Sequence, residues 1–208
     1  MARTQQQRRK ETVARLIDAA IDTIIEVGYA KASAAVIAKR AKVSDGALFR
    51  HFPTMSDFMA ATAREVARRQ VELGSKLSAD ISADQPALPA ALAILRDIAG
   101  SETNTVWHEL LMAARTDEKL RGPLQAVLTE YIHTIYESAK HGPGMDQIPE
   151  DVFAVLLTIV LNTFDGAAMV RRVLPTPELE DARIAMLAEF AQSLTSGQFS
   201  GVATVPER

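Results

Sequence analysis

Apolar residues recur with helical spacing along most of this chain, and no other feature constrains the fold as strongly. In the clearest segment they lie three and four residues apart, with charged residues between them, at Val13, Leu16, Ile17, Ala20, Ile21, Ile24 and Ile25. This spacing places them on one face of an α-helix that ends at Gly28. Because no segment combines alternating apolar and polar residues with hairpin turns, the sequence predicts an all-α fold.

Turn and capping residues divide the rest of the chain into further helices, for about nine in total. Three of them are expected in the first part of the chain: from Ser33, from Ser44 to His51, and from Thr54 or Ser56 to about Leu77. A small, polar stretch with prolines predicts a loop at 78–89. Helices are then expected near 89–99, 102–116, 118–140, 149–173 and 177–196, followed by a disordered tail at 197–208.

The composition is that of an ordinary soluble globular protein of 208 residues, with 48% hydrophobic and 24% charged residues. The chain has no cysteine, which excludes disulfides and thiolate zinc sites and suits a reducing cytoplasm. The N-terminus lacks the apolar core of a signal peptide, and the most apolar run, 152–161, is half the length needed to cross a bilayer. The sequence therefore predicts a cytoplasmic protein without membrane contact.

Charge is distributed unevenly between the two ends of the chain. Residues 1–70 hold 13 Lys and Arg against 7 Asp and Glu, whereas residues 71–208 hold 10 against 19. A basic end joined to an acidic body suits a protein that touches a polyanion with one end only. A chance basic face in solvent would give the same counts, so charge alone leaves both interpretations open.

The segment from Ala32 to Phe52, ASAAVIAKRAKVSDGALFRHF, predicts two short helices joined by a tight link. The second is too short to be stable alone, so packing is expected behind it, from Val43, Leu48 and Phe52. Its outer side would then carry Asp45, Gly46, Ala47, Arg50 and His51. Small residues there allow a close approach to a surface, and Arg and His can donate hydrogen bonds to bases or phosphates. The alternative is an ordinary helical hairpin with solvated cations.

From Arg9 to about Phe58, about a quarter of the chain, the sequence resembles the N-terminal domain of the TetR (tetracycline-repressor) family. The resemblance lies in LIDAA-x7-G and in IAKRAKVSDGALFRHFPTMSDF. The matching residues are Ala20, Gly28, Ile37, Ala38, Ala41, Val43, Ser44, Gly46, Leu48, Phe49, His51, Phe52 and Pro53. So many fixed spacings, glycine and proline included, are hard to meet by chance.

The resemblance implies a dimeric, sequence-specific DNA-binding regulator, a repressor released from a palindromic operator by a small-molecule effector. It implies a helix-turn-helix head over 9–58, whose last helix continues to about 77, with the Ser44–His51 helix in the major groove of double-stranded DNA. Residues 78–196 would form the helical body that binds the effector and dimerises through its last two helices.

Four residues depart from the usual pattern of the family. Lys42 replaces the usual glycine of the turn, and Ala47, Phe49 and Met55 replace threonine, tyrosine and lysine. Phosphate contacts are therefore expected to come more from an N-terminal arm with Arg3, Arg8, Arg9 and Lys10. From the arm and the head together, the residues singled out as the DNA-binding site are Arg9, Ser33, Lys42, Ser44, Asp45, Gly46, Ala47, Phe49, Arg50 and His51. Within it Ser44, Asp45, Ala47 and Arg50 would contact bases, although Asp45 could equally serve only the helix dipole.

The second half of the chain predicts a self-association surface and an effector site. Segment 149–173 is apolar nearly all round, and 177–196 carries an apolar stripe. A homodimer that packs both segments across a two-fold axis would bury them, and a monomeric core is the alternative. A mostly apolar effector could lie among Trp107, Leu111, Met112, Tyr131 and Phe164, or these residues could simply be core.

The sequence carries no recognisable enzyme or metal motif. His108 and Glu109 are adjacent, but no second histidine completes an HExxH pattern. Glycine-rich phosphate loops and a G-x-S-x-G elbow are also missing. We therefore expect no catalytic residue, no metal and no cofactor. A helical adaptor that does not bind DNA and a small helical enzyme without a recognisable motif are the alternatives.

Overall fold

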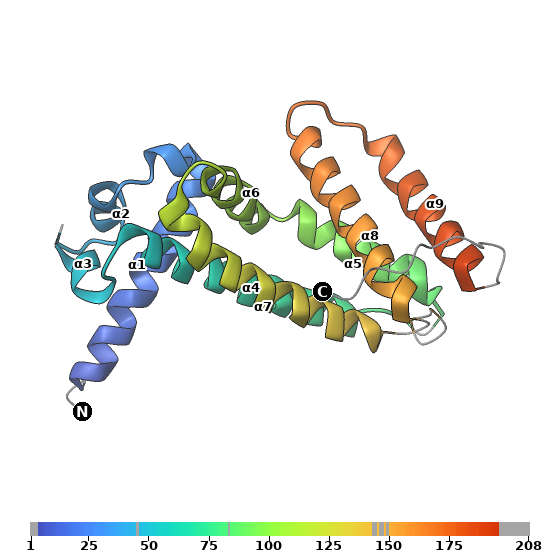
Figure 1. Cartoon of the computed structure of the whole chain (residues 1–208), viewed down its shortest axis with the longest axis horizontal. Helices are drawn as coiled ribbons and strands as arrows, with labels where there is room; N and C mark the ends of the chain where they lie inside the picture. The colour runs from blue at the N-terminus through green and yellow to red at the C-terminus, as the bar shows by residue number, and fades with distance from the viewer. Residues whose placement is uncertain are drawn as a thin grey trace. The chain divides into compact units, whose positions relative to one another are not determined.

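The structure, a computed structural model, describes residues 4–44, 46–82, 84–142, 145, 148 and 150–195. Over these residues all regular elements are helical, which confirms the predicted all-α fold (Figure 1). The elements are α1 (Gln5–Val27), the short 3-10 helix η1 (Tyr29–Lys31), α2 (Ala34–Arg40), α3 (Ala47–His51), α4 (Met55–Ala79), α5 (Ala87–Gly100), α6 (Glu102–Ala114), α7 (Glu118–Lys140), α8 (Glu150–Arg171) and α9 (Pro177–Thr195).

The predicted helices are all present, and the boundaries shift by a few residues. Helix α1 begins at Gln5, so Arg8, Arg9 and Lys10 lie on a helix and not on the arm that the sequence predicted. A capping box explains this early start: the Gln7 amide donates to Thr4 Oγ1 at 3.2 Å and the Thr4 amide donates to Gln7 Oε1 at 2.9 Å. The tail predicted at 197–208 lies outside the described residues.

The chain divides into two compact units. Unit 1 comprises 1–70 and 102–131, and unit 2 comprises 71–101 and 132–208. Unit 1 thus contains α6 and the first half of α7 together with the predicted head. These are units of packing, and the functional division between head and body at about residue 77 stays a prediction.

Unit 1 is built around one apolar cluster. Its large, fully buried members come from six helices: Leu16, Ile21 and Ile24 from α1, Ile37 from α2, Leu48 from α3, Phe58 and Met59 from α4, Leu110 from α6, and Leu120 and Leu124 from α7. Helix α1 packs against α2, α3 and α6. The head helices and α6 therefore share one core, which is what fixes the position of the short helices α2 and α3.

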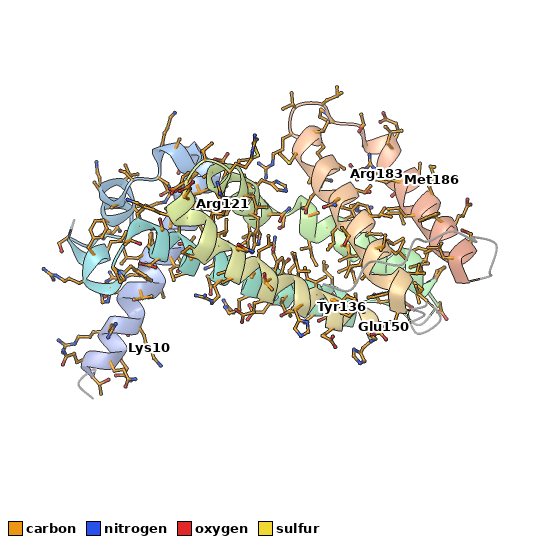
Figure 2. The ribbon with its side chains drawn as sticks, viewed as in Figure 1. Lys10, Arg121, Tyr136, Glu150, Arg183 and Met186 are labelled. Carbon is orange, nitrogen blue, oxygen red and sulfur yellow. The ribbon has the colours of Figure 1, made fainter. Side chains whose placement is uncertain are left out.

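Unit 2 has its own apolar cluster, in which α5 packs against α8 and α9. Near the end of α8 and the start of α9, the Glu180 carboxylate lies between Arg171, at 3.8 Å, and Arg183, at 3.3 Å (Figure 2). On length and composition alone, α8 could cross a membrane over Val152–Arg171, a longer stretch than the run of 152–161 singled out in the sequence. The core helix of a soluble protein meets the same criterion, and the buried residues of α8 pack within unit 2.

Candidate nucleic-acid interface

Helix α2 is fixed at its start by a side-chain cap. Ser33 Oγ accepts a hydrogen bond from the Val36 amide at 3.4 Å, which confirms Ser33 as the predicted N-cap. Ile37 and Ala38 are buried against α1 and the rest of the core. Ser33 itself is exposed at the first turn, where helix amides are free to contact an anion.

The turn between α2 and α3 is closed by Lys42, which has a φ of 54°. Among the described residues, Lys42 is the only non-glycine residue with a positive φ. The conformation lets the Val43 amide donate to the Ala38 carbonyl at 3.0 Å, so that the chain reverses within three residues. Glycine adopts positive φ without steric cost. The conformation of the turn therefore accounts for the glycine that the resemblance to the TetR family predicts at this position. Lys42 is exposed and presents its ammonium group at the turn.

Helix α3 is shorter than predicted. It begins at Ala47, three residues after the expected start at Ser44, and the Ala47 amide donates to the Ser44 carbonyl at 2.8 Å. The Ser44 hydroxyl makes no described cap, and Asp45 lies outside the described residues. Ser44 and Gly46 are exposed and form the turn that leads into the helix.

The later start decides which side chains of α3 face outward. Ala47 is only 7% exposed and Leu48 is fully buried, so the prediction that Ala47 lies on the outer side is wrong. Phe49, 53% exposed, and Arg50 form the outer side instead. Consecutive residues of a helix are 100° apart, so two neighbours that face the core are followed by two that face away from it.

His51 closes α3 and is only half exposed. Its Nδ1 is buried and has no hydrogen-bond partner in the part of the chain that the structure describes. Behind it the Phe52 and Phe58 rings meet at 4.9 Å between centroids. The Thr54 hydroxyl then begins α4, because it accepts from the Asp57 amide at 3.1 Å. His51 therefore lies at the edge of the outer surface.

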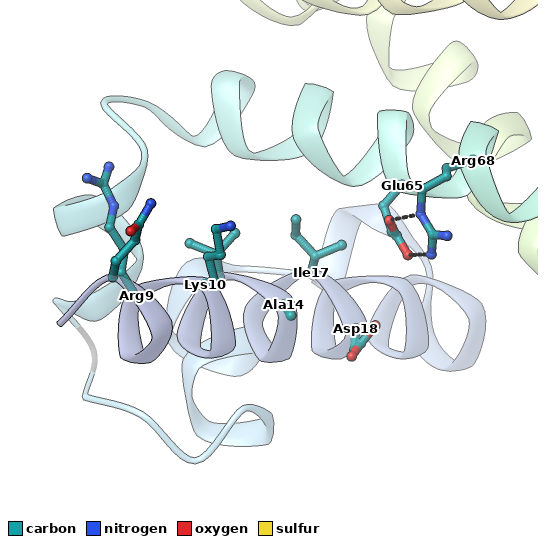
Figure 3. A pocket seen from close by; sticks show the side chains of 9 residues that line it. Arg9, Lys10, Ala14, Ile17, Asp18, Glu65 and Arg68 are labelled. Carbon is teal, nitrogen blue, oxygen red and sulfur yellow. Dashed lines mark hydrogen bonds and ion pairs between the residues drawn. The ribbon is translucent and has the colours of Figure 1, made fainter. Parts of the chain in front are cut away.

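Exposed cations of α1 lie along a groove between α1 and α4 (Figure 3). The groove has a volume of about 610 Å³, with Arg9 and Lys10 near the start of α1 and with Val13, Ala14 and Ile17 along its wall. Glu65 and Arg68 of α4 line it farther along α1, near Asp18. The start of α1 thus carries cations that the sequence assigned to a flexible arm.

Near this groove, ion pairs form within α4 and between α4 and α1. Glu65 accepts hydrogen bonds from Arg68 at 2.6 Å and from Arg69 at 2.8 Å, and Arg69 also pairs with Asp18 of α1. The hydrogen bond from Arg68, followed by that from Arg69, lowers the pKa of the Glu65 carboxyl to about 2. Glu65 therefore stays ionised under all conditions in which the protein would bind DNA.

A carboxylate of α6 holds the corner between α1 and η1. Glu109 Oε2 accepts a hydrogen bond from the Tyr29 amide at 2.9 Å. Gly28, which precedes Tyr29, has a φ of 83°. A Cβ at Gly28 would lie 3.5 Å from Glu109 Oε2. Burial, and to a lesser degree the charge of Asp117, raises the pKa of the Tyr29 hydroxyl. The sequence had not assigned Glu109 a role in the head, because its partner lies 80 residues away.

The residues predicted to line an effector site are only partly brought together. Trp107 and Tyr131 stack within unit 1 with ring centroids 5.4 Å apart and an angle of 12° between the ring planes. Leu111 and Met112 are exposed on α6, whereas Phe164 is buried in the core of unit 2. A contribution of all five to one effector site stays a prediction.

Comparisons with known proteins support the geometry of the head. The family model described as bacterial regulatory proteins, tetR family, matches residues 16–62. A protein of Mycobacterium tuberculosis, described as an uncharacterized HTH-type transcriptional regulator, is 63% identical over 197 residues, which cover 95% of this chain and all of the relative. A protein of Mycobacterium bovis with the same description is similar to the same extent. The chain belongs to the TetR family.

Solved structures show that the TetR-family fold extends over most of the chain. A transcriptional regulator from Rhodococcus has a TM-score of 0.69 and 23% sequence identity, and the match covers 87% of this chain and 96% of that one. The regulator FadR from Bacillus subtilis, in complex with stearoyl-CoA, has a TM-score of 0.59 and 20% identity, with 88% and 98% covered. Both matches include the body as well as the head.

Membership of the TetR family makes the chain a DNA-binding transcriptional regulator of the helix-turn-helix type. The alternatives of a helical adaptor or a small helical enzyme are not favoured, because neither uses the α2–α3 surface. In the described residues, no three His, Asp or Glu residues gather where they could hold a metal ion. The individual DNA contacts stay predictions.

Proposed function

We propose that this TetR-family chain is a homodimeric repressor that binds a palindromic operator and leaves it when a mostly apolar small molecule binds. The outer side of α3 carries the proposal. Phe49 and Arg50 project from a helix whose other face, Ala47 and Leu48, is buried in the head. A side chain such as Arg50 can donate two hydrogen bonds to a guanine edge in the major groove.

Exposed groups around α3 supply the phosphate contacts in this proposal. Ser33 at the start of α2, Lys42 at the turn and Arg9 on α1 belong to the same compact unit as α3 and are all exposed. Contacts of this type set the register of the protein on the duplex and make the affinity depend on salt. Arg50 would contact bases. At Ser44 and Gly46 the backbone itself would approach the duplex.

Exposed apolar residues of α8 and α9 support the homodimer. Met169 and Val170 of α8 and Leu179 and Met186 of α9 are exposed, together with Val173 and Leu174 between the helices. Met186, labelled on α9 in Figure 2, has the most exposed side chain of these residues of α9. An apolar surface of this extent on the last two helices is typical of an interface between copies. Two copies would offer two α3 helices, as a palindrome requires.

Two observations support the effector part of the proposal: a solved structure with the same fold, and the aromatic residues of α6 and α7 in this chain. The FadR neighbour, which has the same fold, is in complex with stearoyl-CoA, a molecule with a long apolar acyl chain. In this chain aromatic residues of α6 and α7 stack in the core of unit 1. A small molecule that binds there would weaken DNA binding only if it favours a conformation of the dimer that fits the operator less well.

The proposal is tested by selecting duplexes from random DNA and then measuring binding by fluorescence anisotropy. We expect a two-fold symmetric site whose half-sites are about 34–36 Å apart, or a multiple of that spacing, and an affinity that falls steeply with salt. Arg50→Ala should weaken binding at least about fivefold, since a base contact of this type is worth about 1–3 kcal/mol. Arg115→Ala is the matched control, because Arg115 is exposed in unit 1 outside the head.

The outcomes separate the proposal from its alternatives. Selection of no duplex at low ionic strength would exclude DNA binding. Equal losses for Arg50→Ala and Arg115→Ala would show only a nonspecific effect of charge, and α3 would not contact bases.

A further inference from the structure

Buried polar side chains gather in unit 1 beside the stacked Trp107 and Tyr131. Gln70 of α4 is 1% exposed and donates its Nε2 to Asn104 Oδ1 of α6 at 2.8 Å. Asn104 Nδ2 in turn lies 3.3 Å from His108 Nε2. Asn104, Trp107 and His108 are three and four residues apart on α6, so they share one face of that helix. Gln70 meets this face through its hydrogen bond to Asn104.

Two polar atoms of this group have no partner in the described part of the chain. Gln70 Oε1 is a buried acceptor and the Trp107 Nε1–H is a buried donor. Trp107 is 3% exposed, so bulk water does not reach its indole nitrogen. Buried polar groups of native proteins are nearly always paired, and an unpaired one asks for an explanation. The two atoms have opposite hydrogen-bond character, as one accepts and the other donates.

The surroundings of these atoms are apolar and aromatic. Trp107 stacks on the half-buried Tyr131 of α7, and Leu110, Leu124 and Val127 complete the same cluster. Gln70, Asn104 and Trp107 carry no charge, and His108, beyond Asn104, is the one titratable side chain of the group. A charged ligand group would lack a fixed counter-charge among them, and burying it unpaired would be unfavourable. A neutral polar group on an apolar molecule fits this environment better.

We propose that Gln70 and Trp107 bind the polar end of the effector, and that this end is a neutral group that both donates and accepts hydrogen bonds, such as a hydroxyl. The hydroxyl donates to Gln70 Oε1 and accepts from the Trp107 Nε1–H, while the apolar part of the molecule lies against the Trp107 and Tyr131 rings. The Gln70–Asn104 hydrogen bond holds the Gln70 amide in the orientation that leaves Oε1 for the ligand. This inference rests on the proposed effector-responsive function, and it names the chemical class of the effector.

The full-length protein provides its own test, because Trp107 is its only tryptophan. Its fluorescence is titrated with 1-nonanol and with methyl octyl ether, two isomers of equal size of which the ether cannot donate a hydrogen bond. We expect 1-nonanol to change the emission saturably and to bind at least about fivefold more tightly than the ether. Nonanoate, the charged analogue, is expected to bind more weakly than 1-nonanol.

Substitution of Gln70 removes the acceptor. In Gln70→Met the preference for the alcohol over the ether should disappear, whereas Gln125→Met, at an exposed position of α7, should leave it unchanged. Equal binding of the two isomers to the unsubstituted protein, or no saturable change with either, would overturn the inference without need of a variant. Tighter binding of nonanoate would contradict the neutral class.

Operator binding is measured in the same preparation and keeps the two proposals apart. A protein that binds its operator but does not distinguish alcohol from ether contradicts the effector inference alone. A protein that distinguishes the isomers but binds no duplex contradicts the repressor function alone.

Discussion

Lys42 combines an unfavourable backbone conformation with a favourable position for its charge. A left-handed φ costs an ordinary residue about 1 kcal/mol relative to glycine. The turn tolerates this cost, and the ammonium group lies exposed between α2 and α3. Glycine would relieve the backbone at this turn, so the contribution that lysine makes there is its exposed cation.

Lys42→Gly should therefore separate stability from DNA binding. We expect the free energy of unfolding to stay the same or to rise by up to about 1 kcal/mol, because glycine adopts positive φ without strain. Operator affinity should fall and its dependence on salt should become shallower by about two counterions for the homodimer, one for each Lys42. Urea denaturation and anisotropy measure the two effects.

The matched control is Lys39→Gly in α2, where glycine should cost about 1 kcal/mol. If both variants lose the same stability, the conformation of Lys42 is not strained.

Glu65 predicts a pH dependence of stability. Hydrogen bonds from Arg68 and then Arg69 lower its pKa from 4.5 to about 2 in the folded protein. The folded state therefore binds fewer protons than the unfolded state, and the stabilisation is present above pH 4.5 and is lost as the pH falls towards 2. Because the pairs are partly solvent-screened, the contribution should be about 1 kcal/mol.

Glu65→Gln tests this dependence by denaturation in urea between pH 7 and pH 3. The variant should be less stable at pH 7 and should lose less stability on acidification than the unsubstituted protein. Parallel pH profiles of the two proteins would rule out Glu65 as the titrating group.

At the scale of helices, the Glu109 carboxylate is a contact that helix periodicity does not reveal. Its removal in Glu109→Ala leaves the partly buried Tyr29 amide without its acceptor, which should cost about 1–3 kcal/mol of unfolding free energy. Glu109→Gln retains an oxygen that can accept the same bond and should lose clearly less. Thermal and urea denaturation give the two values, and equal losses would show that charge, not hydrogen bonding, holds the corner.

Most of the helices could be predicted, because they are rich in apolar residues at helical spacing and turn or capping residues separate them. Ser33 and Thr54 form side-chain caps that a local pattern identifies. The start of α3 and the buried side of Ala47 were missed because α3 packs against α1, which is distant in sequence, and a local pattern does not contain that contact. The start of α1 was missed because Thr4 and Gln7 precede its apolar face.

The candidate site could also be predicted only in part from the sequence. Outward positions such as Arg50 follow from the motif, whereas Gln70, Asn104 and Glu109 gain their partners from residues 34 or 80 positions away. Ala47 shows the limit most clearly, because a small residue next to a turn is equally compatible with an outer and an inner position. Sequence spacing fixes neighbours along a helix, and only the tertiary fold fixes neighbours across helices.

At the scale of the whole molecule, the exposed apolar residues of α8 and α9 predict that DNA affinity depends on self-association. Met186→Glu places a charge in this surface and should convert the homodimer to a monomer, with a loss of affinity for a full operator of at least about tenfold. Binding to a duplex with a single half-site should change little. Analytical ultracentrifugation and anisotropy measure both quantities.

Ala185→Glu is the matched control, since it adds the same charge at an exposed position of α9 about 100° away from Met186. A variant Met186→Glu that still sediments as a dimer would place the interface elsewhere.

The shortness of α3 has a consequence for temperature. Five residues cannot hold a helical shape by themselves, so the outward pose of Phe49 and Arg50 lasts only while Leu48 and Phe58 stay packed beneath them. Heating that loosens this packing would release the operator even if most helices stay folded. Genes under its control would then become active on warming, with no inducer present.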